Sequence, residues 1–404
     1  MPHHPPANRD LIRAINRSTV LNTIKNHGPL SRTAIAQRTG LSAATITAIT
    51  GELIQRGLIF EKEEGNSSGG RRPILLALNP AGGCVIGIKL AEDRLTGALT
   101  DLKATVLART TLPLKHPSLD SVIAGIVELV NRLLLSTQNR PRRFLGVGIG
   151  LAGIVDDRRG LLRHSPIFGW KDVPLTDLLT TRIGAPIYID NDVNTLTITE
   201  LWFGKGKGTD NFLTVTIGRG VGLGIVVNGQ VYLGARGGVG ELGHTVIDPE
   251  GNVCPCGKRG CLETYVADPA LMRMAGEAAR WGELPSPPQD IGELVSLARS
   301  GNVAAQAILA RAGEVLGVGI ANLINILNPE LIIISGEGVR AGDFLFNPMR
   351  AVVMANVMPG LAGDTRIDIE PWDDFAWARG AAGLVLQRLF ESPVHRQQAE
   401  ALIA

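Results

Sequence analysis

The sequence predicts an α/β protein in which an N-terminal winged helix-turn-helix precedes a body of two related α/β lobes. Residues 1–80 contain two short capped helices followed by two strands. Three strands, a helix and a further strand follow between residues 84 and 150, and this order recurs in looser form from Asn211. The 404 residues are enough for two or three domains with sizeable cores.

The N-terminal head shows the local pattern of a helix-turn-helix. An apolar helix face ends at Gly28, and Ser31 caps a short helix that runs to about Thr39. Gly40 ends that helix, and Ser42 caps the next one across a three-residue turn, a spacing typical of this motif. The buried face of the second helix is predicted at i, i+3 and i+7, which are Ile46, Ile49 and Leu53.

A wing is predicted after these helices. A strand from Leu58 to Glu61, a loop from Glu63 to Gly70 and a strand from Ile74 to Leu78 form the expected hairpin. The second helix exposes short hydroxyl and methyl side chains that can approach phosphates and thymine methyls, which favours A·T-rich half-sites. The predicted DNA contacts are Ser42, Ala44, Thr45 and Thr47, then Arg71 and Arg72 at the base of the wing, and Arg32, which fits a phosphate contact and a solvated surface equally well.

The charge distribution agrees with a DNA-binding head. Residues 1–80 contain ten Lys or Arg and five Asp or Glu, a net charge of +5, whereas the whole chain carries +2, so the body carries −3. This asymmetry is expected of a nucleic-acid-binding module joined to a neutral-to-acidic body. Apolar periodicity alone also allows a small helical dimerisation or capping domain.

The linker Asn79–Gly83 marks the start of the body. The predicted elements of its first lobe are strands at Cys84–Leu90, Leu95–Asp101 and Ala104–Thr110, a helix at Leu119–Leu135 and a strand at Phe144–Gly150.

Three cysteines and a histidine lie close together in the segment Gly240–Glu263, which reads GELGHTVIDPEGNVCPCGKRGCLE. Thiolate and imidazole ligands at short loop spacing suit tetrahedral Zn²⁺, and four protein ligands leave no open position, which indicates a structural metal. Unrelated buried cysteines are the alternative. Gly257 and Gly260 favour the metal, because a chain that folds round a small ion needs backbone freedom. The predicted ligands are His244, Cys254, Cys256 and Cys261.

Acidic residues flank these ligands and a second polar pair lies upstream. Glu241 precedes His244 by one helical turn and Glu263 follows the last cysteine, so the metal would hold two carboxylates and an imidazole together. Asn191 and Asp192 lie between a strand (Pro186–Ile189) and a helix (Val193–Phe203), where they suit hydrogen bonds to sugar hydroxyls. The alternative is that Asp192 is a simple helix N-cap.

GELGH followed by CxCGxxGCLE resembles the ROK family (repressor, open reading frame, kinase), and the likeness runs from about residue 18 to the C-terminus. It implies a sugar-kinase and actin-like (ribonuclease H-like) body, whose C-terminal helix, about Phe375–Glu391, returns to the first lobe. The implied domains are a DNA-binding head at 1–80, a smaller lobe at 81–200 plus 375–404, and a larger zinc-containing lobe at 201–374. The sugar contacts that the resemblance implies are Gly153, Asn191, Asp192, Glu241, His244 and Glu263, of which Asp192 matches the catalytic base of the kinases.

The resemblance favours the transcriptional-regulator branch over an enzyme. Where family kinases carry Asp-x-Gly-Gly-Thr, this chain reads KLAED from Lys89 to Asp93, and the second phosphate turn has Arg219 in place of threonine. A GxGxG pattern such as Gly218–Gly222 is more often a tight strand connection than a nucleotide site. The alternatives are a sugar kinase with an accessory head and a body that binds a protein partner.

The expected regulator binds a palindromic operator as a homodimer or a dimer of dimers, responds to a sugar and works in the cytoplasm. Cys84, the one cysteine outside the metal set, argues for a reducing compartment, and the polar start MPHHPPANRD lacks the pattern of a signal peptide. The apolar stretch Val315–Ser335 is interrupted by polar residues, so it predicts a core helix and a buried strand rather than a membrane span.

Overall fold

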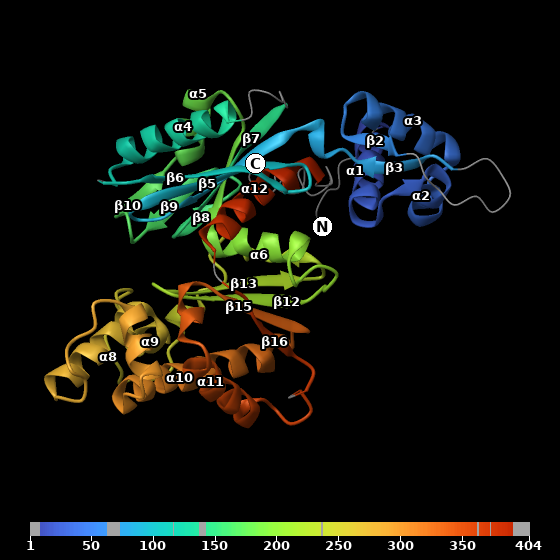
Figure 1. Ribbon diagram of the computed structural model, residues 1–404. Coiled ribbons are helices and arrows are strands. Elements are labelled where there is room, and N and C mark those ends of the chain that lie inside the picture. The colour runs from blue at the N-terminus through green and yellow to red at the C-terminus, as the bar shows by residue number, and fades with distance from the viewer. Residues whose placement is uncertain are drawn as a thin grey trace. The chain divides into compact units, whose positions relative to one another are not determined.

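The structure is a computed structural model that describes residues 9–62, 73–115, 117–136, 143–235, 237–361, 363–371 and 373–390. The chain folds into two compact units, Met1–Asp190 with Ala378–Ala404, and Asn191–Trp377. The first unit contains the head and one α/β lobe, and the second contains the other α/β lobe (Figure 1).

The head is a winged helix-turn-helix, as predicted. Its elements are α1 (Arg9–His27), β1 (Leu30–Ser31), α2 (Arg32–Thr39), α3 (Ala43–Gln55), β2 (Ile59–Lys62) and β3 (Leu75–Leu78), with sheet order β1-β3-β2. Ser31 and Ser42 cap α2 and α3 by accepting backbone N–H groups, and Gly40 ends α2 with φ 70°. The predicted loop Glu63–Gly70, Arg71 and Arg72 lie outside the described residues.

The lobe of the first unit is a five-stranded sheet in the order β11-β7-β4-β5-β6. Its elements are η1 (Pro80–Gly82), β4 (Cys84–Leu90), β5 (Arg94–Asp101), β6 (Val106–Pro113), α4 (Leu119–Leu135), β7 (Phe144–Leu151), β8 (Ile154–Asp156), β9 (Leu161–Ser165), β10 (Trp170–Val173), α5 (Leu175–Ile183), β11 (Ile187–Asn191) and α12 (Asp374–Phe390). Strands β8 to β10, of 3 to 5 residues each, form a separate small sheet that the sequence analysis does not predict.

The predicted third strand began two residues too early. The Asp101 carboxylate accepts the N–H groups of Lys103 and Thr105 at 2.8 and 2.9 Å, and Ala104 has φ 54°. These bonds hold a turn at the position where alternation predicted the start of a strand, because a carboxylate that binds nearby N–H groups competes with strand pairing. The strand β6 therefore starts at Val106.

The two faces of this sheet carry different helices. Ile86 and Ile88 of β4 belong to the core that α4 covers, whereas Gly87 faces α12 (Figure 1). A Cβ atom on Gly87 would lie 1.8 Å from the Ala378 oxygen, and one on Gly148 of β7 would lie 1.8 Å from the Ala381 oxygen. The backbone of α12 therefore rests directly on the sheet, which confirms that the C-terminal helix returns to the first lobe.

The second unit repeats this plan in a sheet of order β14-β13-β12-β15-β16. In both sheets the first strand is central, with an antiparallel hairpin on one side. The elements of the second unit are α6 (Asp192–Phe203), β12 (Phe212–Ile217), β13 (Val221–Val227), β14 (Gln230–Val231), η2 (Leu242–His244), α7 (Glu263–Val266), α8 (Asp268–Arg280), α9 (Ile291–Arg299), α10 (Val303–Leu327), β15 (Leu331–Ser335), η3 (Glu337–Ala341), α11 (Asp343–Asn356) and β16 (Arg366–Ile369).

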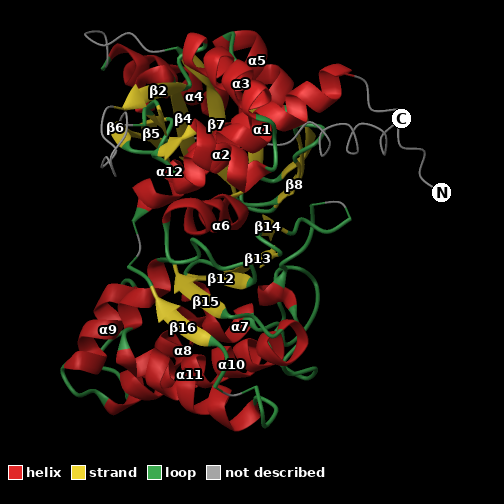
Figure 2. Ribbon diagram, turned by 90° about the vertical axis from the view of Figure 1, so that its right-hand side faces the viewer, coloured by secondary structure: helices red, strands yellow, loops and turns green. Residues whose placement is uncertain are grey.

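Helices cover both faces of the second sheet, with α6 on one face and α10 and α11 on the other (Figure 2). Alternating residues of β12 contribute to the two faces, since Leu213 and Val215 belong to the core with α10 while Phe212 packs with Leu201 of α6. The boundary expected after residue 200 falls inside α6, which groups with the second unit.

Among the described residues, one helix, α10, is long and apolar enough to cross a membrane by length and composition. However, 67% of its most apolar window is buried within the protein. It packs closely on α11, since a Cβ atom on Gly313 would lie 2.0 Å from the Leu345 oxygen. The predicted core helix followed by a buried strand is therefore confirmed as α10 and β15.

The contact between α12 and the sheet can be tested with Gly148→Ala. The added methyl group must displace the α12 backbone, and we expect a loss of stability of about 1–3 kcal/mol or more, measured as a lower urea midpoint. Gly276→Ala is the matched control, because Gly276 lies within α8 with nothing within 4 Å of its Cβ position. It should gain about 0.5–1 kcal/mol from helix propensity. An unchanged midpoint in Gly148→Ala would contradict the close approach.

Candidate metal and ligand site

Tight turns fold the segment Gly240–Glu263 back on itself. Gly257 and Gly260 have φ values of 90° and 65°, and a Cβ atom on Gly260 would lie 1.4 Å from the Asp248 oxygen. The Cys254 N–H donates to the Lys258 oxygen at 2.8 Å, which closes the turn between two of the cysteines. The glycines therefore provide the backbone freedom that the sequence predicted.

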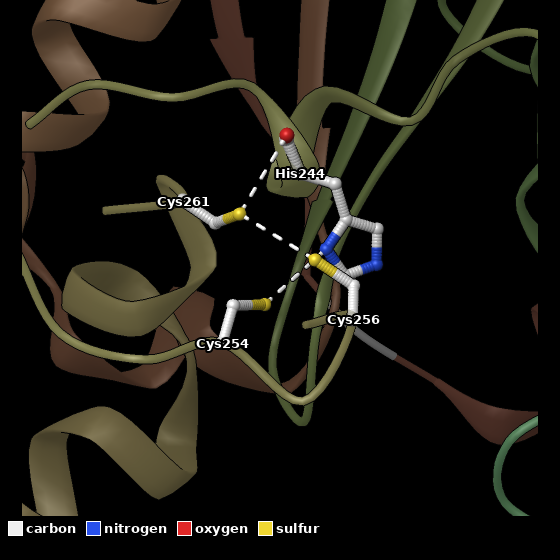
Figure 3. Close-up of side chains that lie close together, drawn as sticks. All are labelled: His244, Cys254, Cys256 and Cys261. Carbon is white, nitrogen blue, oxygen red and sulfur yellow. Dashed lines mark hydrogen bonds between the residues drawn. The ribbon is translucent and has the colours of Figure 1, made fainter. Parts of the chain in front are cut away.

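The loop brings the predicted ligands together (Figure 3). One donor atom from each of His244, Cys254, Cys256 and Cys261 lies within 4.8 Å of the others. His244 Nδ1 is 3.5 Å from Cys254 Sγ, and the Sγ atoms of Cys256 and Cys261 are 3.7 Å apart. Tetrahedral bond lengths of zinc predict edges of about 3.6 Å for N···S and about 3.8 Å for S···S. The four side chains can therefore hold a metal ion.

The thiol groups differ in acidity. Burial raises the pKa of Cys254 to about 12 and also raises the pKa of Cys261. A hydrogen bond from the Lys258 backbone lowers the pKa of the exposed Cys256. Metal ions bind the thiolate form, so binding at this cluster releases protons.

The His244 ring connects the cysteine cluster to an acidic group. Its Nδ1 atom faces Cys254, whereas its Nε2 atom lies 3.9 Å from Oε2 of Glu241. The Lys258 ammonium donates to the His244 carbonyl oxygen at 2.7 Å and fixes the backbone. An imidazole that binds a metal through one nitrogen can donate its other N–H to a carboxylate or a ligand.

Buried leucines anchor the functional side chains. Leu242, next to Glu241, and Leu262, between Cys261 and Glu263, both belong to the core that includes α10. A Cβ atom on Gly319 of α10 would lie 2.4 Å from Leu262 Cδ1, so this leucine fits a space that only glycine provides. The polar residues are thus held by apolar neighbours in the chain.

Glu263 reaches a backbone turn from another part of the second unit. Its Oε2 atom accepts the Val221 N–H at 3.2 Å. Val221 pairs with Ile217 across Gly218–Gly220, so these residues form a tight turn between β12 and β13. A Cβ atom on Gly243 would lie 3.2 Å from the same carboxylate oxygen, so Glu263 also lies beside η2.

Asn191 and Asp192 lie at the start of α6, next to this turn. Asn191 Oδ1 accepts the Val193 N–H at 2.8 Å, and Asp192 Oδ1 lies 3.0 Å from the same nitrogen. Asn191 is therefore the N-cap, whereas the alternative assigned that role to Asp192. Val193 packs on Gly222, since a Cβ atom added to Gly222 would lie 2.5 Å from the Val193 side chain. The start of α6 and Glu263 thus lie on the same turn.

The sixth predicted sugar contact, Gly153, belongs to the first unit. It has φ 141°, and a Cβ atom there would lie 2.4 Å from the His164 oxygen. The sequence did not predict that Glu337 lies beside this site. Its Oε2 atom is 2.6 Å from the position that a Cβ atom on Gly218 would occupy. No local pattern marks Glu337, because only the fold of the second unit brings η3 to this turn.

The predicted DNA contacts of the head fall into two groups: Ser42 and the small residues of α3, and the already paired Arg32. Ser42 Oγ accepts the Thr45 N–H at 3.2 Å, and Thr47 Oγ1 donates to the Ala43 oxygen at 2.8 Å, while Ser42, Ala44 and Thr47 are exposed. Arg32 instead donates to Glu61 at 2.8 Å and to Thr50 at 3.2 Å.

Comparison with known proteins identifies the family. The sequence model of the ROK family matches residues 85–388, and that of the MarR family matches residues 11–72. The chain belongs to the ROK family. It is 30% identical over 396 residues to the DNA-binding transcriptional dual regulator NagC of Escherichia coli, covering 95% of this chain and 98% of that protein. It is 29% identical over 394 residues to the xylose repressor of Caldicellulosiruptor bescii, covering 96% and 99%.

Solved structures agree with this assignment. A ROK family transcriptional regulator, a homolog of the E. coli MLC protein, superposes with a TM-score of 0.86 at 29% identity, covering 97% of this chain and 100% of that chain. A ROK family glucokinase from Streptomyces griseus, in complex with glucose and AMPPNP, superposes with a TM-score of 0.65 at 25% identity, covering 75% and 99%. The kinase match covers less of this chain than the regulator match.

Proposed function

We propose that this protein is a sugar-responsive transcriptional repressor. The observation that carries the proposal is the presence, in one chain, of a winged helix-turn-helix and a cluster of four potential metal ligands, in which His244 lies beside Glu241. NagC and the xylose repressor resemble the chain over nearly its whole length, head included. The protein works in the cytoplasm, where operator DNA and sugar are both present.

The metal is a structural Zn²⁺ ion held by His244, Cys254, Cys256 and Cys261. Three thiolates and an imidazole are a donor set that zinc favours, and a four-ligand set leaves no position for catalysis. Its role is to fix the loop that carries Glu241, His244 and Glu263.

Cys256→Ser should abolish stoichiometric zinc, because it removes one of four ligands. Metal analysis of protein purified without added zinc measures the loss directly. Cys84→Ser is the matched control, since Cys84 is buried in β4 of the other unit, and it should retain one zinc per chain. A full zinc content in Cys256→Ser would disprove the ligand assignment.

The sugar contacts are carboxylate, amide and imidazole groups that suit vicinal hydroxyls. Asn191 and Asp192 lie at the start of α6, Glu263 lies at the adjoining turn, and Glu241 and His244 lie at η2. Gly153 is a further sugar contact that the family resemblance implies.

The head binds operator DNA with Ser42, Ala44, Thr45 and Thr47 of α3, and with Arg71 and Arg72 of the wing. Small residues on α3 favour A·T-rich half-sites. Two heads of a homodimer, or of a dimer of dimers, meet a palindromic operator on one face of the duplex.

The body is not an enzyme. The chain between β4 and β5 closes as a tight turn, with the Ala91 N–H donating to the Arg94 oxygen at 3.0 Å and Asp93 paired with Arg94 at 2.9 Å. The turn between β12 and β13, which is the second phosphate turn of the kinases, already lies against the carboxylates of Glu263 and Glu337. Each close pair of carboxylate and phosphate charges costs about 1 to 4 kcal/mol.

Purified protein should therefore show no sugar-dependent ATP turnover in a coupled assay across the sugars that bind. Lys89, where kinases have the metal-side aspartate, and Glu92 and Asp93 all oppose a magnesium triphosphate. Asp192→Asn serves as the control for contaminating kinases, because it removes the only match to a catalytic base. Turnover that disappears in Asp192→Asn would support the alternative, a sugar kinase with an accessory head.

A switch between sugar and DNA uses α12. This helix begins in the second unit and continues from Ala378 in the first. At its other end, Ser18 Oγ and Asn22 Nδ2 of α1 donate to the Phe390 oxygen at 2.8 and 2.7 Å. A sugar-dependent rearrangement of the second unit can thus change how the heads of a dimer are spaced.

Sugar should weaken operator binding by about 5- to 150-fold, the usual range of allosteric coupling. A thermal-shift panel of sugars and sugar phosphates identifies the effector, because a ligand stabilises by about RT ln(1 + [L]/Kd). An operator selected from random duplexes is then titrated with and without it. Glu241→Ala should bind this DNA normally but ignore sugar, whereas Glu250→Ala, an exposed acid of the same segment, should behave as wild type. Equal wild-type affinity with and without saturating sugar would reject the switch.

A further inference from the structure

Three arginines of the head converge on a single carboxylate. Arg13 and Arg17 of α1 and Arg56 at the end of α3 place guanidinium nitrogens 3.1, 3.0 and 2.9 Å from the oxygens of Glu52. The Glu52 side chain is only 15% exposed, whereas those of Arg13 and Arg56 are 68% and 51% exposed. We call these four residues the arginine cluster.

The arginine cluster has a surplus of positive charge. Three guanidinium groups against one carboxylate leave a net charge of +2, and Arg9 and Asp10 at the start of α1 add one charge of each sign. Burial raises the pKa of Glu52, but the three arginines outweigh this effect and lower it. Glu52 is therefore ionised at neutral pH, which holds the arginines in place without neutralising them. Arg32 differs, because its pair with Glu61 is one to one.

The position of the cluster on α3 matches the edge of a DNA groove. Glu52 follows Thr45 by seven residues, so it lies two turns further on the same side of the helix, a distance of about 10 Å. The major groove is about 12 Å wide and is bordered by phosphates. A helix that reads bases near Thr45 therefore brings residues two turns away close to the DNA backbone. Ala48 and Gly51, which are exposed between them, are too small to keep the duplex away.

We propose that Arg13, Arg17 and Arg56, gathered on Glu52, form a second DNA-binding site of the head that holds backbone phosphates beside the recognition helix. The inference rests on the DNA-binding function proposed above and adds residues to it. Guanidinium groups bind phosphate oxygens in a bidentate manner, and Glu52 orders them before DNA arrives, which lowers the entropic cost of binding. Because phosphates are common to all sequences, this site contributes affinity rather than sequence preference.

The test is a salt titration of full-length protein with a short, labelled duplex of mixed sequence, followed by fluorescence anisotropy. Each phosphate contact contributes about 0.9 to the slope of log K against log salt. The double variant Arg13→Ala/Arg56→Ala should therefore flatten the slope by about 1.8. For each substitution, the loss of affinity relative to wild type should be about eightfold larger at 0.1 M salt than at 1 M. Arg13→Lys/Arg56→Lys keeps both charges and should restore the slope.

Two controls separate this site from other roles. Arg311→Ala removes an arginine of similar exposure, 63%, from a one-to-one pair with Glu314 in the second unit, and it should leave the slope unchanged. If the cluster only joins α1 to α3, the alanine variants will lower the melting temperature and keep the wild-type slope, which overturns the proposal. An equal loss of slope in Arg311→Ala also overturns it. Wild-type protein without DNA affinity would reject the repressor function itself.

Discussion

The direct contact between the α12 backbone and strands β4 and β7 is the constraint on which the first unit depends. Glycines at positions 87 and 148 remove the side chains that would separate helix from sheet, so carbonyl groups of α12 lie where Cβ atoms would otherwise be. The helix is fixed further by Arg388, which pairs with Asp157 at 3.2 Å, and by Arg379, which donates to the Ala104 oxygen at 3.0 Å. Because α12 is held along its length, its last carbonyl can reach α1 of the head.

The candidate ligand site of the second unit depends on a different principle. Two of its carboxylate residues, Glu241 and Glu263, are adjacent in sequence to the core residues Leu242 and Leu262. The four side chains that can hold a metal ion, His244, Cys254, Cys256 and Cys261, lie between these anchors in the chain. A site built in this way keeps its carboxylates in place at the surface, although exposed acidic side chains are usually mobile.

The features that sequence predicted well are those with a local physical cause. Serine caps, a glycine at a helix end and ligands at fixed spacing act within a few residues, so the helix-turn-helix and the Cys3His cluster were recognisable. Strand β6 was misplaced because Asp101 binds backbone N–H groups that alternation does not reveal. Glu337 had no local pattern, because the turn beside it belongs to another element of the fold. For Glu52 only the pair with Arg56 at i+4 is local, whereas Arg13 and Arg17 come from α1. Arg71 and Arg72 remain predictions from sequence.

The bonds from Ser18 and Asn22 to Phe390 join the two ends of the described chain, and Lys25 adds a cation over the Phe390 ring at 4.8 Å. The head is therefore not a detachable module, even though it is continuous in sequence. Ser18 is buried, and its hydroxyl donates to the last carbonyl of α12. A chimera that grafts this head onto the body of a relative must also carry the matching last helix, since otherwise a polar face of α1 loses its partner at the junction.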